Sequence, residues 1–507
     1  MIRALKRIER MEKHMSIKYF FKQIITLFAL LLLLDSTPTL TTITEYSYSD
    51  PYPVFTTLDP HLYLQMRQKL RFKGYDLDGE RDEWFGFSIS PFSQSSNSTR
   101  IDCMISPVTT PATQPPSSPC GAPCPDVDTC LGNIHGRWSM LGLLFGNTPE
   151  GQPLPKILQD VLMSFSIANV ASRCAPEGPI NTSAPQLYID NNQNIGFFDV
   201  PMRYRKQGIR FDFKWKLGQD FGISLDTGIA NISQVIGFQD RTPQQSSGCV
   251  TINGCTSIDF CTLEKSLMEN LENIAPAINL DITDFHKLSV EDIRAGIFWR
   301  RAFAVNTHRE DWEPFLLIPF AHVEGSFAVG ARRKFNKFTS LSFGNNDHHA
   351  LGVSAGLNID FTETIEIGGE CGLTHYFGRD VCNMPVPTSA YQSGIYPFTT
   401  TVHVNPANNW HVGLKMFAYH FIGDLSFSFQ YLLIEHNKDS IKLKKPDPAF
   451  LPKVLEELSP WKSQLADVSF NYDISPDFSI GFLWQTPLPS KNTYRATTLM
   501  LSFNAQF

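Results

Sequence analysis

The sequence lacks any uninterrupted apolar run of the roughly 18–20 residues that a membrane-spanning helix requires. Its longest run, residues 24–34, would extend about 16 Å as a helix, which is about half the thickness of a bilayer core. This run follows Lys18 and Lys22 and is typical of the apolar region of a secretion signal. We therefore expect residues 1–40 to be a signal peptide, with Met15 as a candidate true start.

Charge is also scarce. Charged residues make up 18% of the chain, and the formal net charge is -7. Proteins that bind nucleic acid carry concentrated positive charge on the surface that meets the phosphates. The charge balance therefore argues against nucleic acid as a partner.

Signatures of catalysis and metal binding are missing as well. The sequence has no G-x-S-x-G, P-loop or H-E-x-x-H motif. His348 and His349 are adjacent, and adjacent residues of a strand face opposite ways, so both cannot serve one site there. Cys120, Cys124 and Cys130 lack the second cysteine or histidine pair that would complete a zinc site. We expect no enzymatic activity, no cofactor and no metal.

What the sequence does contain is a period of two residues, clearest in its last stretch, residues 494–507. The odd-numbered positions from Leu499 to Phe507 are apolar, whereas Ser502 and Asn504 between them are polar. Successive side chains of a strand point to opposite faces. A strand that crosses a bilayer at a tilt needs about 9–11 residues, apolar outside and polar inside, with aromatic residues at the interfaces. This stretch favours such a strand; the last strand of a soluble sandwich is the alternative.

The same period recurs upstream and, with the last stretch, gives eleven candidate strands. Bacterial barrels have an even number of strands, so we expect at least one more, within 136–146 or 195–206. The ten upstream candidates are 209–217, 221–229, 293–299, 315–323, 351–361, 365–373, 410–416, 425–433, 466–472 and 478–484.

The connections between these strands segregate by length. If strand direction alternates, the short connections fall at one end of the sheet and the long ones at the other. Outer-membrane barrels have short periplasmic turns and long external loops, whereas a soluble sandwich has no reason to segregate them. We predict an all-β fold, a closed antiparallel transmembrane β-barrel of about 12–16 strands over residues 201–507. The short connections are 218–220, 362–364, 422–424 and 475–477, and the long ones are 231–290, 324–349, 378–408 and 436–460.

The ending of the chain resembles the C-terminal signature of Gram-negative outer-membrane β-barrels, in which an alternating apolar strand closes on a terminal Phe, here Phe507. That resemblance implies that Phe507 belongs to the assembly signal recognised by the barrel-assembly machinery. The ten cysteines, the signal-like start and the terminal Phe are together similar to the cysteine-rich major outer membrane porins of the chlamydial type. This second resemblance implies disulfide-linked envelope proteins as partners, with Cys371, Cys382 and the N-terminal cysteine cluster pairing within or between chains.

The region before the barrel has a different composition. Residues 41–135 are rich in Ser, Pro and Cys, and such a composition cannot fill a core, so we expect irregular structure there. Residues 136–200 are expected to hold a short helix and the first-strand region, and a second short helix is expected within 261–279. Behind an export signal, an even number of cysteines predicts disulfides, although their pairing cannot be deduced. The candidates are Cys103, Cys120, Cys124, Cys130, Cys174, Cys249, Cys255, Cys261, Cys371 and Cys382.

Charged residues on the polar faces of the strands would be costly in lipid, so we expect them to line a wet interior. Residues Arg332, Arg333 and Lys334 lie in a long connection that either folds inward as a constriction loop or contacts anionic lipid headgroups. The candidate pore-lining residues are Arg210, Asp212, Lys214, Lys216, Asp226, Arg294, Arg300, Asp360, Glu366, Glu370 and Lys415.

These patterns predict a porin-like channel in the outer membrane of a Gram-negative bacterium. It would let small hydrophilic solutes diffuse passively and would also serve as a structural component of the envelope. The expected partners are outer-membrane lipid, the barrel-assembly machinery, the solutes and further copies of the chain. A barrel lipid hydrolase that uses His348 or His349, and a secreted disulfide-rich adhesin, remain as alternatives.

Overall fold

The computed structural model divides the chain into two units, Met1–Leu40 and Thr41–Phe507. The expected signal peptide, the first of these units, lies outside the described residues, as does most of the Ser/Pro/Cys-rich region. Everything below concerns the second unit. The structure describes residues 85–96, 134–138, 143, 147–164, 198–200, 202–217, 220–236, 239–240, 249–252, 255–259, 267–305, 315–337, 340–361, 365–389, 392, 395–475, 477–488 and 496–507.

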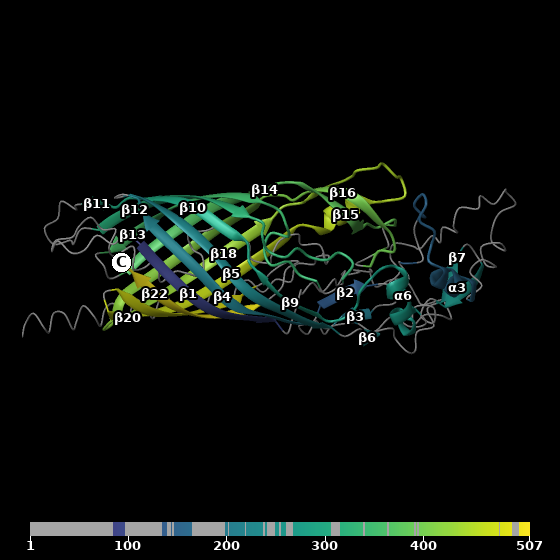
Figure 1. Cartoon of the computed structure of the whole chain (residues 1–507), viewed down its shortest axis with the longest axis horizontal. Coiled ribbons are helices and arrows are strands. Elements are labelled where there is room, and N and C mark those ends of the chain that lie inside the picture. The colour runs from purple at the N-terminus through teal and green to yellow at the C-terminus, as the bar shows by residue number, and fades with distance from the viewer. Residues whose placement is uncertain are drawn as a thin grey trace, which may run out of the picture. The chain divides into compact units, whose positions relative to one another are not determined.

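Twelve strands form one closed antiparallel barrel (Figure 1), as the two-residue period predicts. Neighbouring strands follow the order β10-β12-β13-β14-β17-β18-β20-β21-β22-β1-β4-β5, and β5 pairs with β10 to complete the ring. The strands are β1 (Phe85–Ser96), β4 (Met202–Lys216), β5 (Phe221–Ile236), β10 (Ile293–Arg300), β12 (Phe315–Phe327), β13 (Ala350–Phe361), β14 (Ile365–Tyr376), β17 (Asn409–Ile422), β18 (Leu425–His436), β20 (Trp461–Ser475), β21 (Phe478–Pro487) and β22 (Thr497–Gln506).

The alternation of side chains in β22 is the one read from the sequence. Leu499, Leu501 and Phe503 are exposed on the outer face, whereas Ser502 and Asn504 are fully buried on the inner face. The same division holds in the other strands, so an apolar surface surrounds a largely polar interior. Such an exterior suits hydrocarbon, and a soluble sandwich would place these apolar side chains in its centre.

The twelfth strand is β1, and it comes from neither of the two stretches expected to supply it. Its sequence, FGFSISPFSQSS, lies in the region expected to be irregular because of its serines and its proline. Phe85, Phe87 and Ile89 nevertheless alternate with small inward residues such as Ser88 and Ser90, which suits a strand. β1 pairs with β4 on one side and with β22 on the other, so the first and last barrel strands meet.

Connection lengths segregate as expected. Turns of a few residues link β4 to β5, β13 to β14, β17 to β18 and β20 to β21, all at one end of the barrel. The 301–314 connection, which holds β11 (Phe303–Val305), is the longer link at this end. At the other end, long connections carry β9 (Phe285–Val290), α6 (Leu271–Ala277), α7 (Pro452–Leu458) and a sheet of β15 (Arg379–Pro385), β16 (Thr399–Asn405) and β19 (Ser440–Leu443).

The short helix expected before the barrel is α3 (Lys156–Ser164). None of the helices in the described part of the chain is long and apolar enough to cross a membrane. The remaining short strands are β2 (Ile134–Trp138), β3 (Phe198–Val200) and β6 (Gln239–Asp240) in one sheet, and β7 (Cys249–Ile252) with β8 (Cys255–Asp259) in another.

Candidate functional site: the barrel interior

All the candidate pore-lining residues lie at inward-facing positions of the barrel strands. Even-numbered residues of β4 point inward, which places Arg210, Asp212, Lys214 and Lys216 there, and Asp226 faces inward from β5. Candidates in the other strands also lie at inward-facing positions, which are even-numbered in β10, β13 and β14 and odd-numbered in β17. These candidates are Arg294 and Arg300 in β10, Asp360 in β13, Glu366 and Glu370 in β14, and Lys415 in β17.

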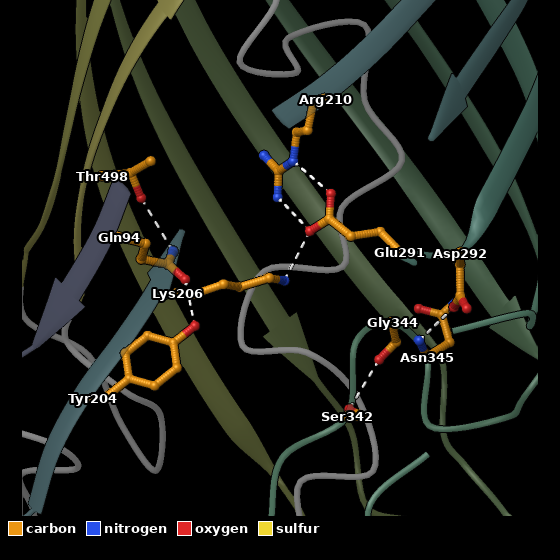
Figure 2. A network of polar contacts seen from close by, with 10 residues as sticks. All are labelled: Gln94, Tyr204, Lys206, Arg210, Glu291, Asp292, Ser342, Gly344, Asn345 and Thr498. Carbon is orange, nitrogen blue, oxygen red and sulfur yellow. Dashed lines mark hydrogen bonds and ion pairs between the residues drawn. The ribbon is translucent and has the colours of Figure 1, made fainter. Parts of the chain in front are cut away.

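Glu291 brings two cations of β4 together inside the barrel (Figure 2). Arg210 donates from Nε at 2.9 Å and from Nη2 at 3.1 Å to the two oxygens of the Glu291 carboxylate. Lys206 Nζ lies 2.8 Å from Glu291 Oε1, and its side chain is only 2% exposed. The Arg210 guanidinium also lies 4.5 Å from the centre of the Phe92 ring, a favourable cation–π distance. A forked, largely buried contact of this kind fixes the side chains in one arrangement.

A strand bulge places Glu291 on this inner face. β9 pairs with β5 in the register Ile229 with Val290, whereas β10 pairs with β5 in the register Asp226 with Arg294, so one extra residue sits between them. A bulge re-aims side chains. Glu291 and Asp292 are consecutive and both buried, which a regular strand with one buried face does not allow. Among the described residues, β9 pairs only with β5.

A second charged cluster lies where β10, β14 and β17 face the interior. The Arg300 guanidinium lies 3.8 Å from the carboxylate of Glu366, which is fully buried. The Tyr419 hydroxyl donates a hydrogen bond of 2.8 Å to the same carboxylate. Because β12 and β13 separate β10 from β14 in the sheet, the Arg300–Glu366 pair spans the interior rather than joining neighbouring strands.

Further inward pairs join acids to histidines and to basic residues. His411 Nε2 lies 3.4 Å from Glu370, and Glu324 lies 4.0 Å from Arg294. Lys415 Nζ lies 4.6 Å from the centre of the Phe320 ring. The interior is therefore lined by both signs of charge, held in pairs.

Asp212 and Asp226 occupy directly opposite positions of β4 and β5, and Arg294 is opposite Asp226 on β10. Two carboxylates side by side repel each other, and a cation in the same row offsets that repulsion. Lys214 and Lys216 continue the basic row of β4 toward the short turn.

The interior also has an apolar part, which sequence reasoning missed. Inward side chains of β1, β4, β5 and β9 form one buried cluster that includes Phe92, Tyr204, Ile232 and Phe285. Phe343, which is 1% exposed, packs in this cluster. Phe343 belongs to the connection between β12 and β13, which we call the inner segment (residues 328–337 and 340–349).

Arg332, Arg333 and Lys334 lie in the inner segment, but Phe343 is the residue that it buries in the apolar cluster. Arg332 is 66% exposed and lies 3.7 Å from Asp347, and Arg379 also pairs with Asp347. The backbone N–H of Arg333 donates to Asn346 Oδ1 at 2.9 Å. The basic residues of the inner segment thus contact other residues of the same segment, whereas Phe343 packs against the barrel wall. Its inward position fits the expected constriction, whose effect on flow remains a prediction.

His348 and His349 face different surroundings, as their adjacency predicts. His348 is buried and its Nδ1 lies 2.9 Å from the Phe377 carbonyl oxygen. Burial lowers the pKa of His348, although the contact with that carbonyl works in the opposite direction. His349 instead accepts a hydrogen bond from the backbone N–H of Ala328 at 3.2 Å. The two rings therefore serve separate structural contacts.

Cys371 and Cys382 are free thiols in the single chain and are not paired with each other, whereas pairing between chains, the other alternative, stays a prediction. Cys371 lies on the outer face in the middle of β14, and Cys382 lies beyond that strand in β15. Five further residues of β14 extend the chain by about 17 Å, whereas a disulfide requires Cα atoms about 4.4–6.8 Å apart. Cys249 and Cys255 lie in β7 and β8 and are not opposite each other. The other six candidates lie outside the described residues.

Sequence reasoning also missed Lys206, Glu291 and Asp292. Lys206 continues the inward row of Arg210 and Lys214 at the same spacing, so a longer β4 would have included it. Glu291 and Asp292 fell in a connection, and a bulge has no clear signal in a single sequence. In the described residues, no group of three or more His, Cys, Asp or Glu side chains is arranged to hold a metal ion.

Comparison with known proteins gives only similarities of structure. No family model and no curated protein matches the chain. An outer-membrane channel from Pseudomonas putida F1 aligns with a TM-score of 0.40 at 8% identity, over 85% of this chain and 98% of that one. The translocator domain of the autotransporter NalP from Neisseria meningitidis aligns with a TM-score of 0.28 at 7% identity, over 88% and 94%. A FadL homologue from Pseudomonas aeruginosa gives 0.24 at 8%, over 84% and 90%.

Proposed function

We propose that this chain is a channel in the outer membrane of a Gram-negative bacterium. One observation carries the proposal: a closed ring of twelve strands has exposed apolar side chains outside and paired charges inside. A closed sheet leaves no unpaired edge, which is what lipid demands of strands. Charges on the inner face of such a ring suit a path for polar solutes.

The solutes we propose are small and hydrophilic, and they cross by passive diffusion. Inward charges of both signs, such as Arg210 with Glu291 and Arg300 with Glu366, favour polar molecules without a strong preference for one sign of ion. The inner segment would act as the constriction, because it buries Phe343 in the interior. Export by a signal peptide, insertion by the barrel-assembly machinery, further copies of the chain and a structural role in the envelope complete the proposal.

Single-channel recording in a planar lipid bilayer tests this function. Purified protein whose mobility on an SDS gel shifts after boiling, the mark of a closed barrel, should give discrete conductance steps. The same preparation after boiling is the control and should give none. A folded, heat-shifting barrel that stays electrically silent would overturn the channel.

A further inference from the structure

Asp292 is a buried carboxylate of the barrel wall that contacts the backbone of the inner segment at both ends. Its Oδ1 accepts hydrogen bonds from the N–H groups of Val329 at 3.2 Å and Gly330 at 2.9 Å. Its Oδ2 accepts one from the N–H of Asn345 at 2.6 Å. Hydrogen bonds to a charged acceptor are stronger than neutral ones. One side chain therefore fastens two points of the chain that are fifteen residues apart.

Two glycines make this contact possible. A Cβ atom at Gly344 would collide with the Asp292 carboxylate, and one at Gly330 would lie 2.9 Å from Asp292 Oδ1. A carboxylate tightly enclosed by backbone cannot move aside as an exposed one could. At these two positions glycine is required by the approach of Asp292 and not by a turn conformation.

The bulge makes Asp292, which contacts the inner segment, the direct neighbour of Glu291, which contacts the charged residues of β4. Glu291, the preceding residue, is held by Lys206 and Arg210 of β4 (Figure 2). Its backbone N–H donates to the carbonyl oxygen of Gly228 at 2.8 Å. With Glu291 fixed to the wall, Asp292 has little freedom except toward the inner segment.

The inner segment has further contacts with the interior, and they point the same way. Asn345 Nδ2 donates to Ser326 Oγ at 2.9 Å, and the Ala331 N–H donates to Ser289 Oγ at 3.2 Å. Both serines are at inward positions of their strands, β12 and β9. Phe343 adds apolar contact with the interior cluster.

We propose that Asp292 is the positioning residue that holds the inner segment inside the barrel. Neutral hydrogen bonds and the Phe343 contact are separate attachments. The single charged acceptor is the one that ties both ends of the segment at once. Its effect on conductance rests on the proposed channel, whereas its hold on the segment does not.

Limited digestion of the folded full-length protein with trypsin tests directly whether Asp292 holds the inner segment in place. Trypsin cuts after Arg332, Arg333 or Lys334 only when several residues around the bond lie extended in its active site, so we expect cleavage to speed up when the segment leaves the contacts that Asp292 makes. We expect Asp292→Ala and Gly344→Ala to speed this cleavage by a factor of about ten or more, because about tenfold corresponds to one charged hydrogen bond and Asp292 accepts three. Asp292→Asn keeps one acceptor oxygen and should fall between these variants and the wild type.

Two controls separate release of the segment from general damage. Gly325→Ala also adds a methyl group to a glycine near this end of the barrel, but the nearest atom would be 3.9 Å away, so cleavage should stay at the wild-type rate. Asp467→Asn removes an inward carboxylate from β20, outside the inner segment, and should also leave cleavage unchanged. Every variant is compared only in the form that shifts on the SDS gel after boiling, which shows that the barrel is closed.

The outcomes divide clearly. Faster cleavage in Asp292→Ala and Gly344→Ala but not in the controls supports the proposal. Wild-type rates in both, or equal acceleration in Gly325→Ala, would overturn it. If the wild type forms channels, the same two variants should raise the conductance step; unchanged steps despite faster cleavage would overturn the link to flow. If the wild type forms no channel, the proposed function fails while the digestion still decides the role of Asp292.

Discussion

Charged side chains inside this barrel form ion pairs. The pair of Arg300 and Glu366 illustrates the consequence for stability. Glu366 is fully buried, and both the Arg300 guanidinium and the Tyr419 hydroxyl contact its carboxylate. An ion removed from water is stabilised only by its partners, so the loss of one partner leaves an uncompensated charge.

We expect Glu366→Leu to lower the free energy of unfolding by about 3–5 kcal/mol, because Arg300 then loses the carboxylate that lies 3.8 Å from its guanidinium. The double variant Arg300→Met with Glu366→Leu should recover most of this loss, since it removes both charges. Urea unfolding in lipid vesicles, followed by tryptophan fluorescence, measures both changes. Equal destabilisation in the single and double variants would show that the pair does not interact.

At the scale of the element, regular strands could be read from the sequence and irregular ones could not. β22, β13 and β18 alternate apolar with polar or small residues over most of their length, which fixes both the strand and its outward face. β1 was missed because the first half of its inward face consists of Gly86, Ser88 and Ser90, residue types that are equally common in loops, and because the strand contains Pro91. The bulge at Glu291 and Asp292 depends on the register of β5 and leaves no local mark.

The same limits apply to the candidate site. The charges that follow the strand period in β4, β10 and β14 were found and lie at inward positions, because in a closed sheet the polar face can only be the inner one. Which charges contact each other depends on strand neighbours that are distant in sequence, as with Glu291 and Lys206. The burial of Phe343 inside the barrel was missed because the sequence of the inner segment shows no periodic pattern of apolar residues.

The end of β22 gives an element-level prediction. Phe507 exchanges two backbone hydrogen bonds with Phe85, of 2.9 Å and 3.2 Å, and the two rings stack with centres 6.5 Å apart. Deletion of Phe507 removes these contacts at the seam between β1 and β22. We expect a several-fold smaller fraction of heat-shifting protein on SDS gels of membranes, and Phe361→Ala, which truncates another exposed aromatic residue, should leave that fraction nearly unchanged. Normal assembly without Phe507 would contradict its part in the signal.

Over the whole molecule, the alternating direction of the strands places each connection at one of the two rims of the barrel. The connections after β1, β5 and β14 all leave from the rim opposite the short turns. Apart from Cys371, every cysteine lies in one of these three connections. If the short turns face the periplasm, as in outer-membrane barrels, the connections that carry these cysteines leave the barrel on the side of the cell exterior.

An epitope tag measures this orientation. Inserted after Lys445, in a long connection, the tag should be detected by antibody on intact cells. Inserted after Gly423, in the short turn between β17 and β18, it should be detected only after the outer membrane is permeabilised. Both insertions lie in exposed loops, so both proteins should fold. The reverse pattern would show that the barrel is inverted or lies in another membrane.

The seam between β1 and β22 makes assembly an all-or-none event. The hydrogen bond from Ser88 to Asn504 links positions 416 residues apart, so the cylinder is completed only when the final stretch arrives. Until then, β1 and β21 each have an unpaired strand edge. The free amide and carbonyl groups of these edges can pair with strands of other chains. A chain truncated before its last dozen residues would therefore form an open sheet that is prone to aggregate. A cell that makes this protein must protect the two unpaired edges during translocation.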